Sequence, residues 1–194
     1  MTGSTSTSDE ILRCARSLLI QGGYNGFSYA DIAKVVGIRN ASIHHHFPSK
    51  AELVRTLVAR YREEAEAGIA HLERQISDPA AQLGAYVGYW EGCISDASRP
   101  FCVCALLASE IPVLPEEIAR EVRAHFRMLS AWLTSVLERG AQQGSLRFAG
   151  TAKAEAESFM ACAHGAMLSA RAYGDPKAFG LVTRPLLERL APPH

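Results

Sequence analysis

Two short helices joined by a glycine turn are encoded by the stretch Phe27-Ser-Tyr-Ala-Asp-Ile-Ala-Lys-Val-Val-Gly-Ile-Arg-Asn-Ala-Ser-Ile-His-His-His-Phe-Pro-Ser-Lys50. Ser28 is placed to cap the first helix, whose apolar residues recur at helical spacing. Gly37 ends it, because glycine enters the left-handed conformation at low cost. A second helix opens at Arg39 or Asn40 and spans about two turns. This is the pattern of a helix-turn-helix that reads DNA, although helical hairpins with a glycine bend also occur in ordinary all-α cores.

The outward face of the second helix is polar and suited to contacts with bases or phosphates. Its three successive histidines cannot all face one metal ion, because neighbours on a helix point about 100° apart. We therefore expect no metal there. The polar face consists of Arg39, Asn40, Ser42, His44 and His45.

The residues themselves resemble a known family. The run Ile-Ala-x-x-x-Gly-Ile, followed by Ser-Ile-His-His-His-Phe-Pro-Ser-Lys-x-x-Leu, is similar to the N-terminal domain of TetR-type transcriptional regulators. The likeness spans about residues 9–55, with an amphipathic helix over Asp9–Ile20 and a glycine-rich turn over Gln21–Phe27. It implies an all-α protein, in which a three-helix helix-turn-helix domain precedes a helical domain for effector binding and dimerisation.

The resemblance also implies which residues touch DNA. Ser28 and Lys50 would hold phosphates from two helix N-termini. His44 stands where the family usually has tyrosine, and His46 where it usually has an aromatic residue. The side chains expected at the DNA are Ser28, Arg39, Asn40, Ala41, Ser42, His44, His45, His46 and Lys50.

Length and charge fit this organisation. The chain has 194 residues and no formal net charge, but residues 1–60 carry seven Lys or Arg against four Asp or Glu. So small a basic excess favours specific, dimer-assisted DNA contact over non-specific binding, although an ordinary distribution of solvated charges would look the same. We expect a disordered arm over 1–8, the helix-turn-helix domain over 9–55, and the effector-binding and dimerisation domain over 56–194.

The helix that follows the helix-turn-helix is capped by Ser49 and runs to about Gln75. Helical patterns continue beyond it. A strong apolar stripe predicts a helix over Glu116–Gln143. Two further helices are expected over Thr151–Tyr173, which is rich in small residues, and Lys177–Leu190. By resemblance, the chain forms a homodimer through about residues 151–190, and the alternative is that this pair closes the monomer's own core.

Aromatic and methionine side chains between these helices suggest a site for an apolar or aromatic effector. The alternative is that they are plain core, which is the more common role of such stripes. Arg123, His125 and His164 could supply polar contacts to a ligand or lie at the surface. The candidate pocket residues are Tyr86, Tyr89, Trp90, Cys93, Phe101, Arg123, Phe126, Trp132, Met160, His164 and Met167.

A possible thiol switch involves Cys102 and Cys104. Pro100 suits the first turn of a helix, so Cys102 would lie near its positive end, close to Arg99, and both influences favour the reactive thiolate. The two cysteines point about 200° apart, so each would need another partner, such as Cys93 or Cys162. The alternative is that they are small apolar residues in a packed helix.

These patterns predict a dimeric regulator that binds a palindromic DNA operator and is released from it by a small effector. A thiol-based electrophile or redox sensor on the same scaffold is the alternative. We expect no enzyme, no catalytic residues and no cofactor, because the sequence lacks a nucleophile elbow, phosphate loop or zinc-protease motif. With no secretory signal or membrane-spanning stretch, a cytoplasmic location is expected.

Overall fold

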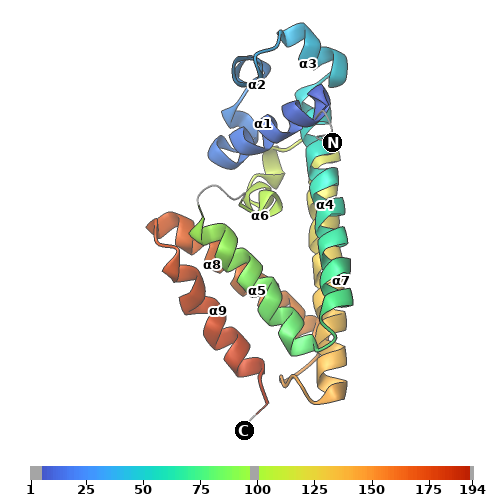
Figure 1. Ribbon diagram of the computed structural model, residues 1–194, viewed down its shortest axis with the longest axis vertical. Coiled ribbons are helices and arrows are strands. Elements are labelled where there is room, and N and C mark those ends of the chain that lie inside the picture. Colours follow the sequence, from blue (N-terminus) through green and yellow to red (C-terminus); the bar gives the residue numbers. More distant parts are fainter. Residues whose placement is uncertain (1–5, 97–100, 193–194) are drawn as a thin grey trace. The chain divides into compact units, whose positions relative to one another are not determined.

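The computed structural model describes residues 6–96 and 101–192, and all its regular elements within them are helical (Figure 1). The chain divides into two compact units. The first unit comprises Met1–Glu64 and Cys102–His125, and the second comprises Ala65–Phe101 and Phe126–His194. An all-α fold with a helix-turn-helix near the N-terminus was predicted from the sequence and is confirmed.

The first unit holds the predicted helix-turn-helix. Its first helix begins at Thr7, two residues before the expected start, because Ser6 is the N-cap and accepts a hydrogen bond from the Asp9 amide at 3.2 Å. Residues 1–5 of the expected N-terminal arm lie outside the described residues. The elements are α1 (Thr7–Gly22), η1 (Tyr24–Gly26), α2 (Tyr29–Val36), α3 (Asn40–His46), α6 (Val103–Ala108), η2 (Ile111–Val113) and the first parts of α4 (Lys50–Gln75) and α7 (Glu116–Gln143).

The core of the first unit is aliphatic. The side chains of α1, α2, α3 and α4 that point inward recur at helical spacing, so each helix buries one stripe and leaves the other in solvent. The fully buried members include Ile11, Leu19, Ile32, Ile43 and Leu53.

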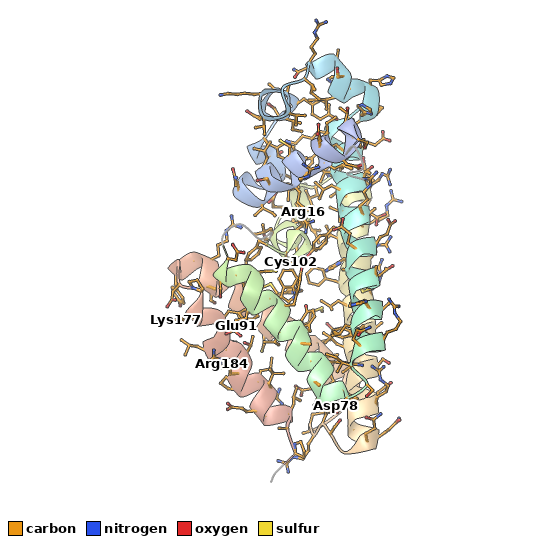
Figure 2. All side chains as sticks on the ribbon, viewed as in Figure 1. Arg16, Asp78, Glu91, Cys102, Lys177 and Arg184 are labelled. Atoms are coloured by element: carbon orange, nitrogen blue, oxygen red, sulfur yellow. The ribbon has the colours of Figure 1, made fainter. Side chains whose placement is uncertain are left out.

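The second unit contains α5 (Pro79–Ser95), α8 (Ala152–Tyr173), α9 (Lys177–Leu190) and the remainders of α4 and α7. Helix α8 packs against α9, and α5 contacts both. Figure 2 shows Glu91 and Arg184 between α5 and α9, where Arg184 Nη2 lies 3.1 Å from Glu91 Oε1. Asp78 caps α5 by accepting a hydrogen bond from the Ala81 amide at 2.8 Å.

Within residues 6–96 and 101–192, every helix is either too short or too polar to cross a lipid bilayer.

Candidate nucleic-acid interface

The turn between α2 and α3 has the geometry that the sequence predicts. Ser28 is the N-cap of α2, and its backbone amide donates to Asp31 Oδ2 at 2.7 Å. Gly37 ends α2 with φ +76° and ψ 29°, a left-handed conformation that costs an L-residue with a side chain about 1–2 kcal/mol. Helix α3 then begins at Asn40 with Arg39 as its N-cap. The sequence alone therefore locates the end of α2 at Gly37 and the start of α3 to within one residue.

Helix α3 presents a polar surface to solvent. Ile43 is fully buried beneath it, and Phe47 at its end is 5% exposed, so these two apolar side chains fix the helix to the core. Ser42 is half-buried. The exposed residues are Arg39, Asn40, Ala41, His44, His45 and His46, which the structure gathers on one short helix and its N-cap.

A second set of contacts holds α3 against α2. The Tyr29 hydroxyl donates to the Phe47 carbonyl at 2.8 Å, and the Tyr29 ring lies edge-on to the His44 ring at 4.7 Å. Burial, together with the negative charge of Glu52, raises the pKa of Tyr29 to about 12, so its hydroxyl keeps the proton that it donates. His44 is thus oriented by α2 while its side chain remains exposed.

Lys50 is half-buried at the start of α4. Its ammonium donates to the Phe27 carbonyl and lies over two rings, 4.9 Å from the centre of Tyr24 and 4.3 Å from that of Phe27. Burial lowers the pKa of Lys50, and the charges of Asp31 and Glu110 oppose that shift. These contacts fix the direction of the lysine before any ligand arrives.

Glu110 makes a contact that the sequence did not reveal. Its Oε2 accepts a hydrogen bond from the Tyr24 amide at 2.9 Å, and its carboxylate lies so close to Gly23 that a Cβ there would come within 2.3 Å of Oε1. Gly23 has φ +73°. Glu110, the residue before η2, is therefore tied to the first residue of η1, across 86 positions of sequence.

The candidate effector residues of the second unit form ring contacts on α5, α7 and α8. Tyr86 lies 5.4 Å from Trp132 and 6.4 Å from Phe159, centre to centre. Phe126 lies 5.0 Å from the His164 ring. Trp90, Cys93, Trp132, Met160 and Met167 are buried.

Three other candidates have different surroundings. Tyr89 is 56% exposed and packs edge-on against Trp90. The Arg171 guanidinium lies over the Phe101 ring, 5.4 Å from the ring centre. Arg123 belongs to the first unit and makes a surface ion pair with Glu116 at 2.9 Å, so the structure does not place it with the other candidates.

Buried polar groups accompany the rings. His164 is 8% exposed, and burial lowers its pKa to about 4, so the imidazole is neutral at physiological pH. Its Nε2 and the indole nitrogens of Trp90 and Trp132 have no hydrogen-bond partner among the described residues. His125, 4% exposed in the first unit, packs against the Tyr61 ring at 5.3 Å.

The cysteine environment differs from the sequence-based expectation. Cys102 is the N-cap of α6, and its Sγ accepts a hydrogen bond from the Ala105 amide at 3.4 Å. It is only 1% exposed, and burial raises the pKa of its thiol, as it does for Cys104. Desolvation thus outweighs the helix start, and the expected shift toward thiolate is wrong in direction. Residues 99 and 100, on which that expectation also relied, lie outside the described residues.

Comparison with known proteins matches both parts of the chain. Residues 11–57 match the family described as bacterial regulatory proteins of the tetR family. Residues 79–186 match the tetracyclin repressor-like C-terminal domain. The HTH-type transcriptional regulator CymR of Pseudomonas putida is 28% identical over 145 residues, which cover 69% of this chain and 67% of CymR.

Two further relatives agree. The HTH-type transcriptional repressor KstR2 of Rhodococcus jostii is 28% identical over 150 residues, covering 75% of this chain and 71% of KstR2. The crystal structure of a TetR-family transcriptional regulator from Agrobacterium tumefaciens is 71% identical, covers 95% of this chain and 97% of its own, and superposes with a TM-score of 0.93. This chain therefore belongs to the TetR family of DNA-binding transcriptional regulators, with an N-terminal helix-turn-helix and a C-terminal ligand-binding domain.

Proposed function

We propose that this regulator is a homodimeric repressor that binds a palindromic operator and is released by a small apolar or aromatic effector. DNA binding would reside in residues 9–55, and effector binding and dimerisation in 56–194. The observation that carries the proposal is the polar face of α3, exposed beyond a left-handed glycine turn and fixed from below by Ile43. Such a helix can enter the major groove of DNA while its buried face stays packed on the core.

The DNA contacts divide by chemistry. Arg39 and Asn40 stand at the N-terminal end of α3, and their side chains can read guanine and adenine edges respectively. Lys50 keeps donor capacity beyond its bond to the Phe27 carbonyl and would hold a phosphate, as would Ser28. The remaining contacts would come from Ala41, Ser42, His44, His45 and His46.

Dimerisation would use the outer faces of α8 and α9. Large apolar side chains there are exposed, namely Leu168 at 43%, Tyr173 at 77%, Leu181 at 76% and Val182 at 40%. Such clustering is typical of a surface that is covered in the functional assembly. Small exposed residues on α8, such as Ala161 and Gly165, allow close helix approach. A two-fold dimer would present two α3 helices to successive major-groove faces.

The effector would bind among the rings of the second unit. The candidate side chains of this unit are mainly aromatic or apolar, and His164 among them is neutral. Such surroundings favour a neutral apolar or aromatic molecule. The free indole nitrogens of Trp90 and Trp132 would donate to acceptors on the effector. Binding would shift the population toward a separation of the two α3 helices that no longer matches the operator. A coupling of about 1–3 kcal/mol would suffice for a several-fold change in affinity.

The thiol-sensor alternative receives less support. A buried Cys102 with a raised pKa is a poor nucleophile toward electrophiles, because the thiolate is the reactive form.

Fluorescence anisotropy with the palindromic DNA nearest the regulator's own gene tests this assignment at fixed salt. Lys50→Ala should weaken binding to all sequences similarly and reduce the salt slope by about 1, whereas Arg39→Ala or Asn40→Ala should relax the preference at one base pair by about 1–3 kcal/mol. Arg120→Ala, an exposed arginine on α7, serves as the matched control and should leave binding unchanged. Equal losses on every sequence from Lys50, Arg39 and Asn40 variants would contradict the division of roles.

The effector step needs its own measurement on the same DNA. Saturating effector should lower operator affinity and change the distance between labels on the two α3 helices of a dimer. Unchanged affinity and distance would refute the release mechanism while leaving DNA binding intact.

A further inference from the structure

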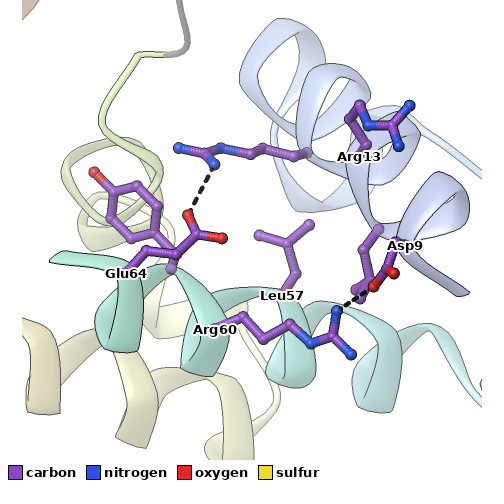
Figure 3. A pocket seen from close by; sticks show the side chains of 8 residues that line it. Asp9, Arg13, Leu57, Arg60 and Glu64 are labelled. Atoms are coloured by element: carbon purple, nitrogen blue, oxygen red, sulfur yellow. Dashed lines mark hydrogen bonds and ion pairs between the residues drawn. The ribbon is translucent and has the colours of Figure 1, made fainter. Parts of the chain in front are cut away.

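A pocket lies between α1 and α4 within the first unit (Figure 3). Its volume is about 300 Å³, at the lower end of the range for ligand sites. We refer to it as the α1–α4 pocket. It is lined by Asp9, Leu12, Arg13, Arg16, Leu57, Arg60, Tyr61 and Glu64.

Positive charge exceeds negative charge in the α1–α4 pocket. Two ion pairs join the helices across it, Arg60 Nη1 to Asp9 Oδ1 at 2.7 Å and Arg16 Nη1 to Glu64 Oε2 at 3.3 Å (Figure 3). Arg13 also lines the pocket, and no carboxylate of the described residues lies within ion-pair distance of it. Three guanidinium groups thus meet two carboxylates, and one positive charge remains available to a ligand.

Arg16, although it is ion-paired, also has a hydrogen-bond donor without a partner. Its Nε is buried and has no hydrogen-bond partner among the described residues, and its guanidinium lies 4.9 Å from the centre of the Tyr61 ring. A buried donor without an acceptor is unfavourable, and it is normally completed by water, an ion or a ligand. The guanidinium fork matches a carboxylate, which can accept two parallel hydrogen bonds.

The remaining wall of the α1–α4 pocket is apolar. Leu12, Leu57 and Tyr61 are 7%, 4% and 7% exposed, so they leave only a small apolar surface, and the water lost on binding would come mainly from the ligand's own stem. Burial raises the pKa of Tyr61 well above its usual value, so the phenol adds no negative charge.

We propose that the α1–α4 pocket binds a small amphiphilic anion, with its carboxylate held by Arg16 and its apolar stem on Leu12 and Leu57. Arg13, whose side chain points away from Arg16 in Figure 3, would add positive charge without sharing the carboxylate. This ligand would be distinct from the neutral effector proposed for the second unit. Because the pocket joins the first helix of the DNA-binding domain to α4, a bound anion would constrain how α1 lies on α4 and so affect DNA affinity.

The test follows the Arg16 Nε–H resonance of the full-length protein by NMR, with affinity measured by calorimetry. Hexanoate is the probe, hexanamide is its neutral twin, and acetate is the same anion with almost no stem. We expect hexanoate to shift the Arg16 resonance, and acetate and hexanamide to bind at least about tenfold more weakly.

Variants locate the binding. Arg16→Lys should weaken hexanoate about tenfold, because the lysine keeps the charge while removing the Nε donor. Arg13→Gln, which removes a more distant charge, should weaken it less. Arg120→Gln, an exposed arginine of the same unit outside the pocket, should change nothing. Circular dichroism of each variant verifies the fold.

Several results would overturn the proposal. Equal affinity for hexanamide would exclude an anion site, and equal affinity for acetate would exclude the apolar stem. Binding that is unaffected by the Arg13 and Arg16 variants would place it elsewhere, and absence of any shift with hexanoate would exclude the site. A shift caused by duplex DNA and by none of the carboxylates would assign these arginines to DNA phosphates.

Discussion

Replacing His164 with methionine should remove part of the stability loss that mild acid causes. His164 is 8% exposed, and burial lowers its pKa to about 4. In the unfolded chain a histidine titrates at about 6.5. Between these values the unfolded state binds more protons than the native state, so the free energy of unfolding falls as the pH drops from about 6.5 to about 4. Above pH 6.5 the contribution disappears, because both states hold neutral histidine.

The size of the effect follows from the two pKa values. At 1.36 kcal/mol per pH unit, the interval from about 6.5 to about 4 corresponds to about 3 kcal/mol. At pH 5 the native imidazole is still mostly neutral, so about 2 kcal/mol of stability should be lost relative to pH 7.5. Methionine has no titrating group and suits the apolar surroundings that His164 shares with Phe126.

Urea unfolding at pH 7.5 and pH 5 measures this difference, with protein concentration held constant because dimerisation would shift the midpoint. Wild type should lose about 2 kcal/mol more than the His164→Met variant between the two conditions. His71→Met, the same change at an exposed histidine, should follow wild type. Parallel losses in wild type and His164→Met would refute the argument that His164 is buried in its neutral form.

Three other expectations concern the turn at Gly37, the contact between Glu110 and Tyr24, and the dimer. Gly37→Ala should lower the free energy of unfolding by about 1–2 kcal/mol. Backbone strain alone would cause the loss, since the added Cβ would meet no atom within 4 Å. Gly26→Ala, at a glycine without positive φ, should cost less in the same unfolding assay. Glu110→Ala should speed hydrogen exchange at the Tyr24 amide, which donates to the Glu110 carboxylate, and unchanged exchange would contradict the contact. Leu181→Arg should convert dimer to monomer in sedimentation, whereas Val113→Arg, at a 65% exposed site of the first unit, should not.

Local patterns predicted the helices well. The sequence places α7 over Glu116–Gln143 and α9 over Lys177–Leu190, and the structure has the same bounds. Gly37 and the capping of α2 by Ser28 were likewise found from the sequence. These features depend on residues within one or two turns of each other, and neighbours in sequence are enough to recognise them.

Features that depend on distant parts of the chain were missed or misjudged. The Glu110 contact with Tyr24 gives no local pattern, because the partners are 86 positions apart. Cys102 does lie at the start of a helix as expected, but its pKa responds mainly to burial, which the local sequence does not report. For Arg123, the sequence left open a ligand contact or a surface position, and the structure gives it a surface ion pair with Glu116.

The capping bond of Ser28 constrains what this serine can add to DNA recognition. Its single hydroxyl proton is donated to Asp31 Oδ2 at 2.7 Å, and the same bond lowers the pKa of Asp31, so the carboxylate stays ionised. A phosphate approaching Ser28 would have to take that proton's hydrogen bond away from the carboxylate, next to a like charge. One bond is exchanged for another, so Ser28 would contribute little to binding strength. Its value would lie in orientation, because a phosphate can replace the bond to Asp31 only where it meets the distance and angle that a hydrogen bond from the Ser28 hydroxyl requires.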